Sequence, residues 1–134
     1  MIYLLDTNII AYLIKNKDLS LFEKFEEVSK KDRIGISSIT YTEIYFGLEK
    51  KNSETLKIKV LTFLDIFEIF PFDERSAIEY GKIRAVLEKT GNLIGALDML
   101  IAAHAKSLGA VLITNNEREF RKVHGLIVEN WCHS

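Results

Sequence analysis

The sequence predicts an α/β fold in which helices flank a central, mainly parallel sheet of four to five strands. Short apolar segments without a helical repeat alternate along the chain with segments whose apolar residues recur every three or four positions. Most of the intervals between strands are long enough for the crossover helices that a parallel sheet needs. The first short segment, residues 2–5, is apolar throughout, which is typical of a strand buried on both faces.

Five strands are expected, all of them short and rich in branched or aromatic side chains. They cover residues 2–5, 33–37, 67–70, 110–113 and 126–128. Pro71, the only proline in the chain, ends the third strand because it cannot donate a backbone hydrogen bond. Asp6 stands directly after the first.

Six helices are expected between these strands, most of them with polar residues at their starts. They cover residues 9–15, 21–31, a segment that begins at 38, 53–65, 73–89 and 96–108. Thr7 and Asn8 are candidate caps for the first helix, Ser20 for the second and Asp73 for the fifth. Gly109 follows the last helix, as is typical of a helix end.

The composition favours one soluble domain over residues 1–134. A chain of this length buries roughly two thirds of its unfolded surface and folds without disulfide staples. Cys132 is the only cysteine, which fits a reducing compartment, and no apolar run reaches the length of a membrane span. We therefore expect a cytoplasmic protein. The net charge is −1, from 18 basic and 19 acidic residues, so a polyanionic substrate would need a local basic patch or a metal ion.

Three acidic residues far apart in the sequence are expected to meet at one edge of this sheet. Asp6 ends the first strand, Glu43 begins a helix after the second, and Asp98 begins the helix before the fourth. The carboxyl ends of parallel strands and the helix starts that follow them line a common crevice, where ligands bind. Asp98 also interrupts an apolar segment, where an unpaired charge is costly to bury.

Such a cluster favours a divalent metal ion. Three carboxylates about 5 Å apart repel one another by about 3 kcal/mol per pair at an effective dielectric constant near 20. All candidate ligands are hard oxygen donors, so Mg²⁺ or Mn²⁺ is expected rather than Zn²⁺. Because such ions bind phosphate oxygens and activate water, hydrolysis of a phosphodiester is the reaction class that the residues favour.

Four segments together resemble the PIN domain family, and within it the VapC-like toxins of type II toxin-antitoxin operons. They are residues 4–8 (LLDTN), 36–47 (ISSITYTEIYFG), 94–105 (IGALDMLIAAHA) and 112–120 (LITNNEREF). The resemblance covers nearly the whole chain and implies a three-layer PIN-like fold. It also implies an endoribonuclease dependent on Mg²⁺ or Mn²⁺ that forms a homodimer and is silenced by a VapB-like antitoxin.

The family's acidic quartet carries over onto Asp6, Glu43 and Asp98, whereas the fourth position departs from the pattern. Many members have Asp where this chain has Asn116, and Glu119, one helical turn later, is the alternative acid. In the mechanism that the resemblance implies, Asp6 and Asp98 bind the metal, and Glu43 ligates it or acts through water. An RNA phosphodiester of a tRNA or rRNA is the expected substrate.

Other roles remain open for several of these residues. Asp6 can be the cap of the first helix, and Glu43 can close a capping box with Thr40. Thr7 and Thr114 can orient the carboxylates or merely end a strand or begin a helix. His104 is expected to be a packed, neutral core residue.

Two roles are also possible for several basic and apolar residues. Five basic residues are candidates for phosphate contacts or ordinary solvated charges: Arg75, Arg84, Lys106, Arg118 and Arg121. Apolar residues of the first two helices could form an antitoxin groove, although core packing is the simpler account: Ile9, Ile10, Leu13, Leu21, Phe22 and Phe25.

Two other functional classes are compatible with part of the sequence pattern. A receiver-type phosphoacceptor domain has a similar length, but it needs a pair of acids after the first strand, where Asp6 stands alone. A catalytically weak or inactive PIN fold that only binds RNA or a protein partner is favoured by the amide at Asn116.

Overall fold

A central sheet of five parallel strands organises the molecule, and the computed structural model describes residues 1–132. The strands are β1 (Ile2–Leu5), β2 (Arg33–Ser37), β3 (Glu68–Phe70), β4 (Val111–Ile113) and β5 (Ile127–Glu129). Their order is β3-β2-β1-β4-β5, and every neighbouring pair is parallel. The predicted α/β class with a mainly parallel sheet is therefore confirmed.

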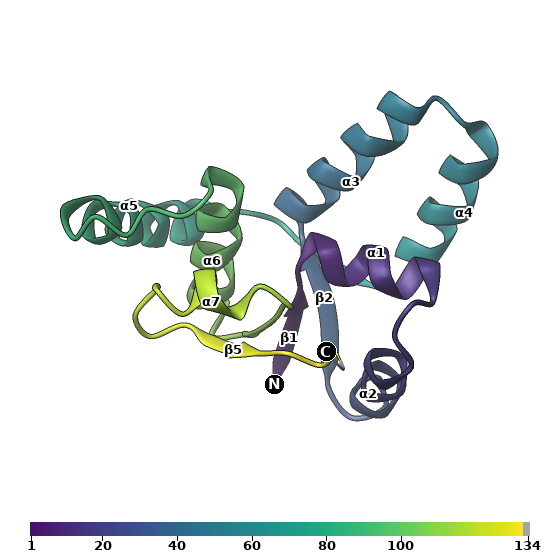
Figure 1. Ribbon diagram of the computed structural model, residues 1–134, viewed down its shortest axis with the longest axis horizontal. Helices are drawn as coiled ribbons and strands as arrows, with labels where there is room; N and C mark the ends of the chain where they lie inside the picture. The colour runs from purple at the N-terminus through teal and green to yellow at the C-terminus, as the bar shows by residue number, and fades with distance from the viewer. Residues whose placement is uncertain (133–134) are drawn as a thin grey trace.

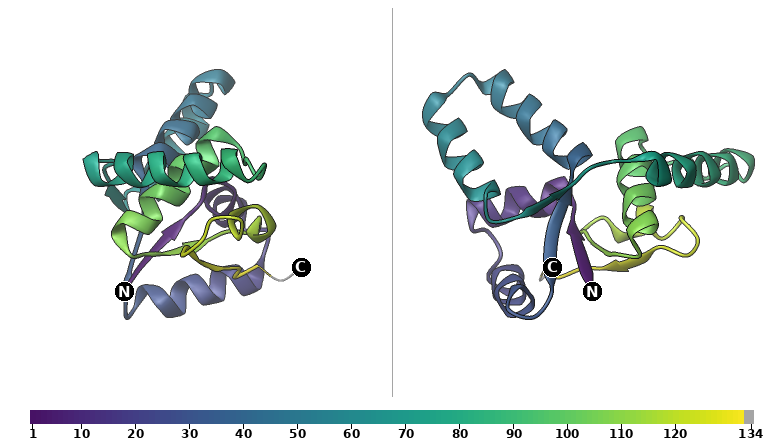
Figure 2. Two further views of the ribbon diagram at one scale, coloured as in Figure 1. Left: turned by 90° about the vertical axis from the view of Figure 1, so that its left-hand side faces the viewer. Right: turned by 180° about the vertical axis from the view of Figure 1, so that it is seen from behind.

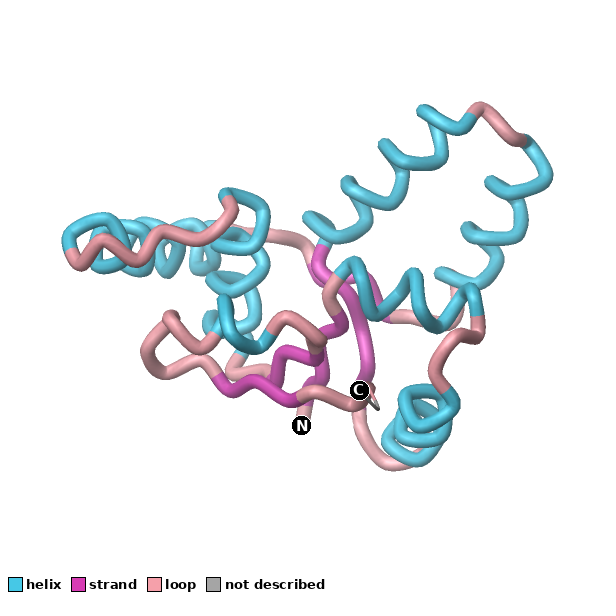
Figure 3. Tube along the Cα trace, in the orientation of Figure 1, coloured by secondary structure: helices cyan, strands magenta, loops and turns pink. Residues whose placement is uncertain are grey.

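Helices cover both faces of this sheet (Figures 1 and 3). They are α1 (Thr7–Lys15), α2 (Leu19–Ser29), α3 (Ser38–Lys51), α4 (Glu54–Leu64), α5 (Glu74–Lys89), α6 (Ala96–Leu108) and α7 (Glu117–Phe120). In Figure 1, α5, α6 and α7 lie on one side of the strands, and α1, α2 and α4 lie on the other. None of the helices in the described part of the chain combines the length and apolarity that crossing a bilayer requires.

The two faces bury two separate apolar cores, and β1 contributes to both. Leu4 packs with residues of α5, α6 and α7, whereas Leu5 packs with residues of α1, α2 and α4. Both leucines are fully buried. This alternation follows from the strand geometry, since successive side chains point to opposite faces of a sheet. It explains why the first strand reads as a continuous apolar run.

The strand order places a crevice at the end of β1. From β1 the chain winds outward through β2 and β3, and then returns to add β4 and β5 on the other side. In such sheets the helices after neighbouring strands leave toward opposite faces, which opens a crevice at the carboxyl ends. Seen from behind, α3 and α6 flank the top of β1 and β2 (Figure 2).

Two of the expected helix caps are wrong, and one short helix was not expected. The second helix begins at Leu19, because Asp18 Oδ1 accepts the Leu21 N–H at 3.0 Å and acts as the cap in place of Ser20. The first helix is capped by Asp6 rather than by Thr7 or Asn8. The short helix α7 was not expected, because four residues are too few to produce a helical repeat.

Candidate active site

Asp6, Glu43 and Asp98 come together in one small cleft. The cleft has a volume of about 100 Å³ and is lined by Asp6, Thr7, Asn8, Glu43, Asp98 and Ile101. Asp6 follows the end of β1, Glu43 lies on α3 after β2, and Asp98 lies in the first turn of α6. The three elements meet here because α3 contacts both α1 and α6.

Asp6 is held rigidly between the sheet and the first helix. Its backbone N–H donates to Ile113 O at 3.0 Å, which extends the pairing of β1 with β4. Its Oδ1 accepts the Ile9 N–H at 3.0 Å and so caps α1. The sequence offered helix capping and membership of the site as alternatives, and the geometry of Asp6 is compatible with both.

Burial, together with the charges of the neighbouring carboxylates Asp98 and Glu43, raises the pKa of the Asp6 carboxyl to about 6. Hydrogen bonds from the Thr114 hydroxyl and the Ile9 N–H oppose this shift. Thr114 also accepts the Asn116 N–H at 2.9 Å, so this threonine both shapes the turn after β4 and contacts Asp6.

Glu43 is oriented by Thr7, the first residue of α1. The Thr7 hydroxyl donates to Glu43 Oε1 at 2.7 Å, which links α1 to α3 across the cleft. The alternative prediction, a capping box between Thr40 and Glu43, is wrong. Ser37 caps α3 by accepting the Ile39 N–H at 3.0 Å, and Thr40 already lies inside the helix.

Asp98 lies at the start of α6, where the helix dipole favours a negative charge. Gly95, the residue before the helix, provides no side-chain cap. A β-carbon at that position would lie 3.4 Å from Asp98 Oδ2, so the carboxylate packs over this glycine. Desolvation raises the pKa of Asp98, and the charges of Glu43 and Glu119 raise it further.

The two candidates for the fourth position lie outside the lining of the cleft. Asn116 precedes α7 and donates its backbone N–H to Thr114 Oγ1, while its side chain makes no capping hydrogen bond. Glu119 forms an ion pair with Lys122 at 3.4 Å. Glu119 is nevertheless close enough to Asp98 to raise its pKa.

The donor chemistry of the cleft fits a hard divalent ion. The ionisable residues lining it are all carboxylates, with no basic residue to balance them, and the pKa values of Asp6 and Asp98 are raised. Within residues 1–132, no three His, Cys, Asp or Glu side chains are arranged closely enough to form a ready-made ion site. Carboxylate oxygens are the ligands that Mg²⁺ and Mn²⁺ prefer.

His104 ties the helix of Asp98 to the start of the helix of Glu43. Its Nδ1 lies 2.7 Å from Ser37 Oγ, and its ring meets the edge of Phe72 with centroids 5.6 Å apart. The ring is buried, and desolvation lowers its pKa, so it is neutral, as expected for a packed core histidine.

Sequence reasoning missed two residues that line the cleft, Asn8 and Ile101. A signal existed for Ile101, which lies three positions after Asp98 and hence on the same helix face. Asn8 was considered only as a helix cap, because its type and position favoured that role.

The sequence matches a known family over most of its length. The family model of the PIN domain matches residues 3–126. Ribonuclease VapC2 of Rickettsia felis is 42% identical over 132 residues, which cover 98% of each chain. The tRNA(fMet)-specific endonuclease VapC of Salmonella typhimurium is 39% identical over 131 residues, covering 97% of this chain and 98% of the relative.

Solved structures agree with these matches. VapBC2 of Rickettsia felis, bound to a DNA fragment from their promoter, gives a TM-score of 0.92 at 41% identity, covering 98% of this chain and 99% of the other. DNA-bound VapBC of Salmonella typhimurium gives a TM-score of 0.88 at 38% identity, with the same coverage. The chain therefore belongs to the PIN domain family, among the VapC ribonucleases.

Proposed function

We propose that this chain is an endoribonuclease toxin that requires Mg²⁺ or Mn²⁺, cuts tRNA and is inhibited by a VapB-like antitoxin. The observation that carries the proposal is the convergence of Asp6, Glu43 and Asp98 in one cleft. Two relatives, from Salmonella typhimurium and Shigella flexneri, are named tRNA(fMet)-specific endonucleases, which supports a tRNA substrate. The cytoplasm, where tRNA is found, is the expected site of action.

In this proposal Asp6 and Asp98 hold the metal ion, and Glu43 ligates it or orients a water molecule. A bound ion of this kind polarises a phosphate oxygen and activates water for attack on the phosphodiester. Thr7 fixes the Glu43 carboxylate through its hydroxyl, and Thr114 and the Ile9 N–H fix Asp6. These contacts keep the carboxylates in place before the substrate binds, which limits the reorganisation needed for reaction.

The antitoxin is proposed to bind an apolar groove beside the cleft. The groove has a volume of about 260 Å³, and Ile10, Ile14 and Leu48 contribute to its lining together with Thr7 and Glu43. Of the residues that the sequence offered for such a groove, Ile10 is part of the lining although it is fully buried, and Ile9, Leu13 and Leu21 are buried in the core. The solved VapBC complexes of relatives support a partner of this type. The homodimer implied by the resemblance is also part of the proposal.

A cleavage assay with Asp98→Asn tests the nuclease proposal. The unmodified protein is expected to cut purified tRNA when Mg²⁺ or Mn²⁺ is present and to stop when EDTA is added. Asp98→Asn is expected to abolish cleavage, because it removes a charge from the ion site. Asp65→Asn, at the exposed end of α4, is the matched control and should cut normally. Full activity in Asp98→Asn would remove this residue from the site.

A second function, RNA or protein binding without cleavage, is favoured by one observation. Asn116 brings an uncharged amide to the position where many relatives of this fold have an acid. The same assay separates the two functions. Binding of tRNA by the unmodified protein with no metal-dependent product would support the binding function and contradict the nuclease.

A further inference from the structure

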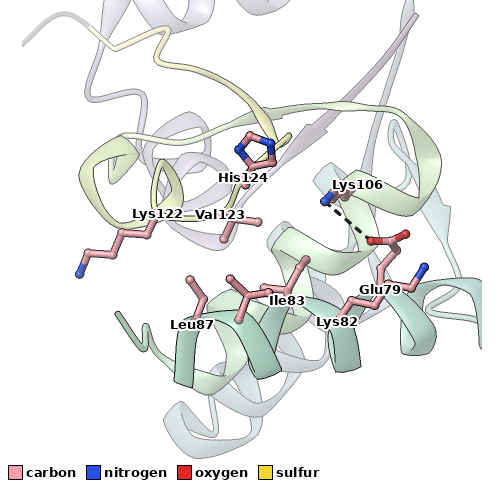
Figure 4. A pocket seen from close by; sticks show the side chains of 9 residues that line it. Glu79, Lys82, Ile83, Leu87, Lys106, Lys122, Val123 and His124 are labelled. Atoms are coloured by element: carbon pink, nitrogen blue, oxygen red, sulfur yellow. Dashed lines mark ion pairs between the residues drawn. The ribbon is translucent and has the colours of Figure 1, made fainter. Parts of the chain in front are cut away.

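A third cavity lies on the flank of the molecule, between α5, α6 and the segment that follows α7. It has a volume of about 410 Å³ (Figure 4). Its apolar floor includes Ile83 and Leu87 of α5 and Val123 of the following segment, all buried. We call this cavity the flank groove. The proposed active site does not use it.

The charged side chains of the flank groove are mostly basic. Lys82, Lys106 and Lys122 line it with a single acid, Glu79, although the chain as a whole has a net charge of −1. Lys106 lies 4.0 Å from Glu79, as the dashed line in Figure 4 marks. Lys82 has no ion pair with any residue in the described part of the chain. The groove therefore concentrates positive charge that the protein's own acids only partly neutralise.

The flank groove is connected to the acidic cleft through two structural elements. Lys122 pairs with Glu119 at 3.4 Å, and hydrogen bonds join Glu119 through Asn116 to Thr114, which follows β4 next to the strand end that pairs with Asp6. Lys106 and Asp98 lie on the same helix, eight residues apart, which corresponds to about 12 Å along its axis. The flank groove and the cleft are therefore about two helical turns apart along the axis of α6.

We propose that the flank groove binds the RNA strand next to the scissile phosphodiester. This inference rests on the proposed function, because it takes RNA as the substrate. In this proposal Lys82 and Lys106 contact backbone phosphates. Phosphate contacts from basic side chains let a protein hold a nucleic-acid strand without reading its sequence.

Binding measurements test the groove separately from catalysis. The probe is a fluorescein-labelled single-stranded RNA of about twenty nucleotides, and the protein carries Asp98→Asn so that the RNA stays intact. In this background, Lys82→Gln together with Lys106→Gln is expected to weaken RNA binding at least fivefold at low salt. The slope of log affinity against log salt should become shallower by about 1.4, since each of the two lost phosphate contacts contributes about 0.7 for a single strand.

Three further variants serve as controls. Lys31→Gln with Lys59→Gln removes the same charge from exposed positions outside the groove and should leave RNA affinity within twofold. Lys82→Arg with Lys106→Arg keeps the charge and should bind as the parent does. Glu79→Gln removes the only acid of the groove and is expected to tighten RNA binding.

Two results would overturn the groove proposal. One is equal RNA affinity for the Lys82→Gln, Lys106→Gln variant and its charge-matched control. The other is loss of affinity for inorganic phosphate or for poly-glutamate in that variant while RNA affinity is kept, which would assign the groove to a small anion or an acidic protein. Failure of the unmodified chain to cut tRNA would contradict the proposed function and leave the binding result intact.

Discussion

Asp6 combines two structural requirements that oppose each other. As the cap of α1 it accepts a backbone N–H, an interaction that favours its charged form. Its burial and its acidic neighbours favour the neutral form. The raised pKa that results means that keeping Asp6 charged lowers the stability of the folded protein when no cation is bound. Perturbed carboxyls in clefts are typical of functional sites.

This conflict predicts a pH-dependent effect of Asp6→Asn on stability. The folded-state pKa, about 6, exceeds the ordinary aspartate pKa of 3.8, so the metal-free folded state retains a proton that the unfolded state releases. The stability of the unmodified protein therefore falls as the pH rises through this window. Asn cannot ionise and is also a good helix cap. The variant's stability advantage should be about 2 kcal/mol larger near pH 7.5 than near pH 4.5.

Urea unfolding in EDTA at both pH values measures this difference. Comparing the variant with the unmodified protein cancels the contribution of His104, whose lowered pKa acts in the opposite direction. Asp65→Asn, outside the cleft, should show the same stability difference at both pH values. An Asp6→Asn advantage that did not change with pH would contradict the raised pKa.

At the scale of elements, the close packing of β2 against β3 depends on one glycine. Gly35 pairs with Leu4 of β1 on one side and with Glu68 of β3 on the other. A β-carbon there would overlap the Glu68 carbonyl oxygen and lie 2.5 Å from Phe70 Cε2.

Gly35→Ala is therefore expected to destabilise the protein by about 1–3 kcal/mol, because the added methyl group overpacks the sheet. Gly81→Ala is the matched control. Gly81 lies inside α5 with open space around its β-carbon position, so alanine should stabilise the helix by about 0.5–1 kcal/mol. Chemical unfolding of both variants measures the two effects. A neutral Gly35→Ala would show that β3 can move away at little cost.

The sequence predicted elements better than their exact ends. The existence of five strands and of helices α1 to α6 followed from apolar spacing, which burial against a sheet enforces. The start of α2 did not, because Asp18 and Ser20 are both good caps and only the folded geometry selects Asp18. The contact between Thr7 and Glu43 spans 36 positions, so no local pattern could predict it.

At the scale of the whole molecule, the three acidic residues of the cleft could be placed at one edge of the sheet before the strand order was known. A parallel sheet brings strand ends and helix starts to the same edge, which was enough to predict that Asp6, Glu43 and Asp98 meet. It was not enough to place Asn116 and Glu119, whose positions depend on the turn after β4 and on the unexpected helix α7. The flank groove was equally hidden, since only the packing of α5 against α6 assembles its lysines.

The proposed nuclease activity depends on one shared ion in the acidic cleft, and Mn²⁺ binding tests this most directly. Electron paramagnetic resonance can measure free Mn²⁺ during titration of the full chain and of three single variants, Asp6→Asn, Glu43→Gln and Asp98→Asn. The unmodified protein and the Asp65→Asn control should bind Mn²⁺ equally, and each cleft variant should bind it at least tenfold more weakly. Unchanged Mn²⁺ affinity in all three cleft variants would contradict the account.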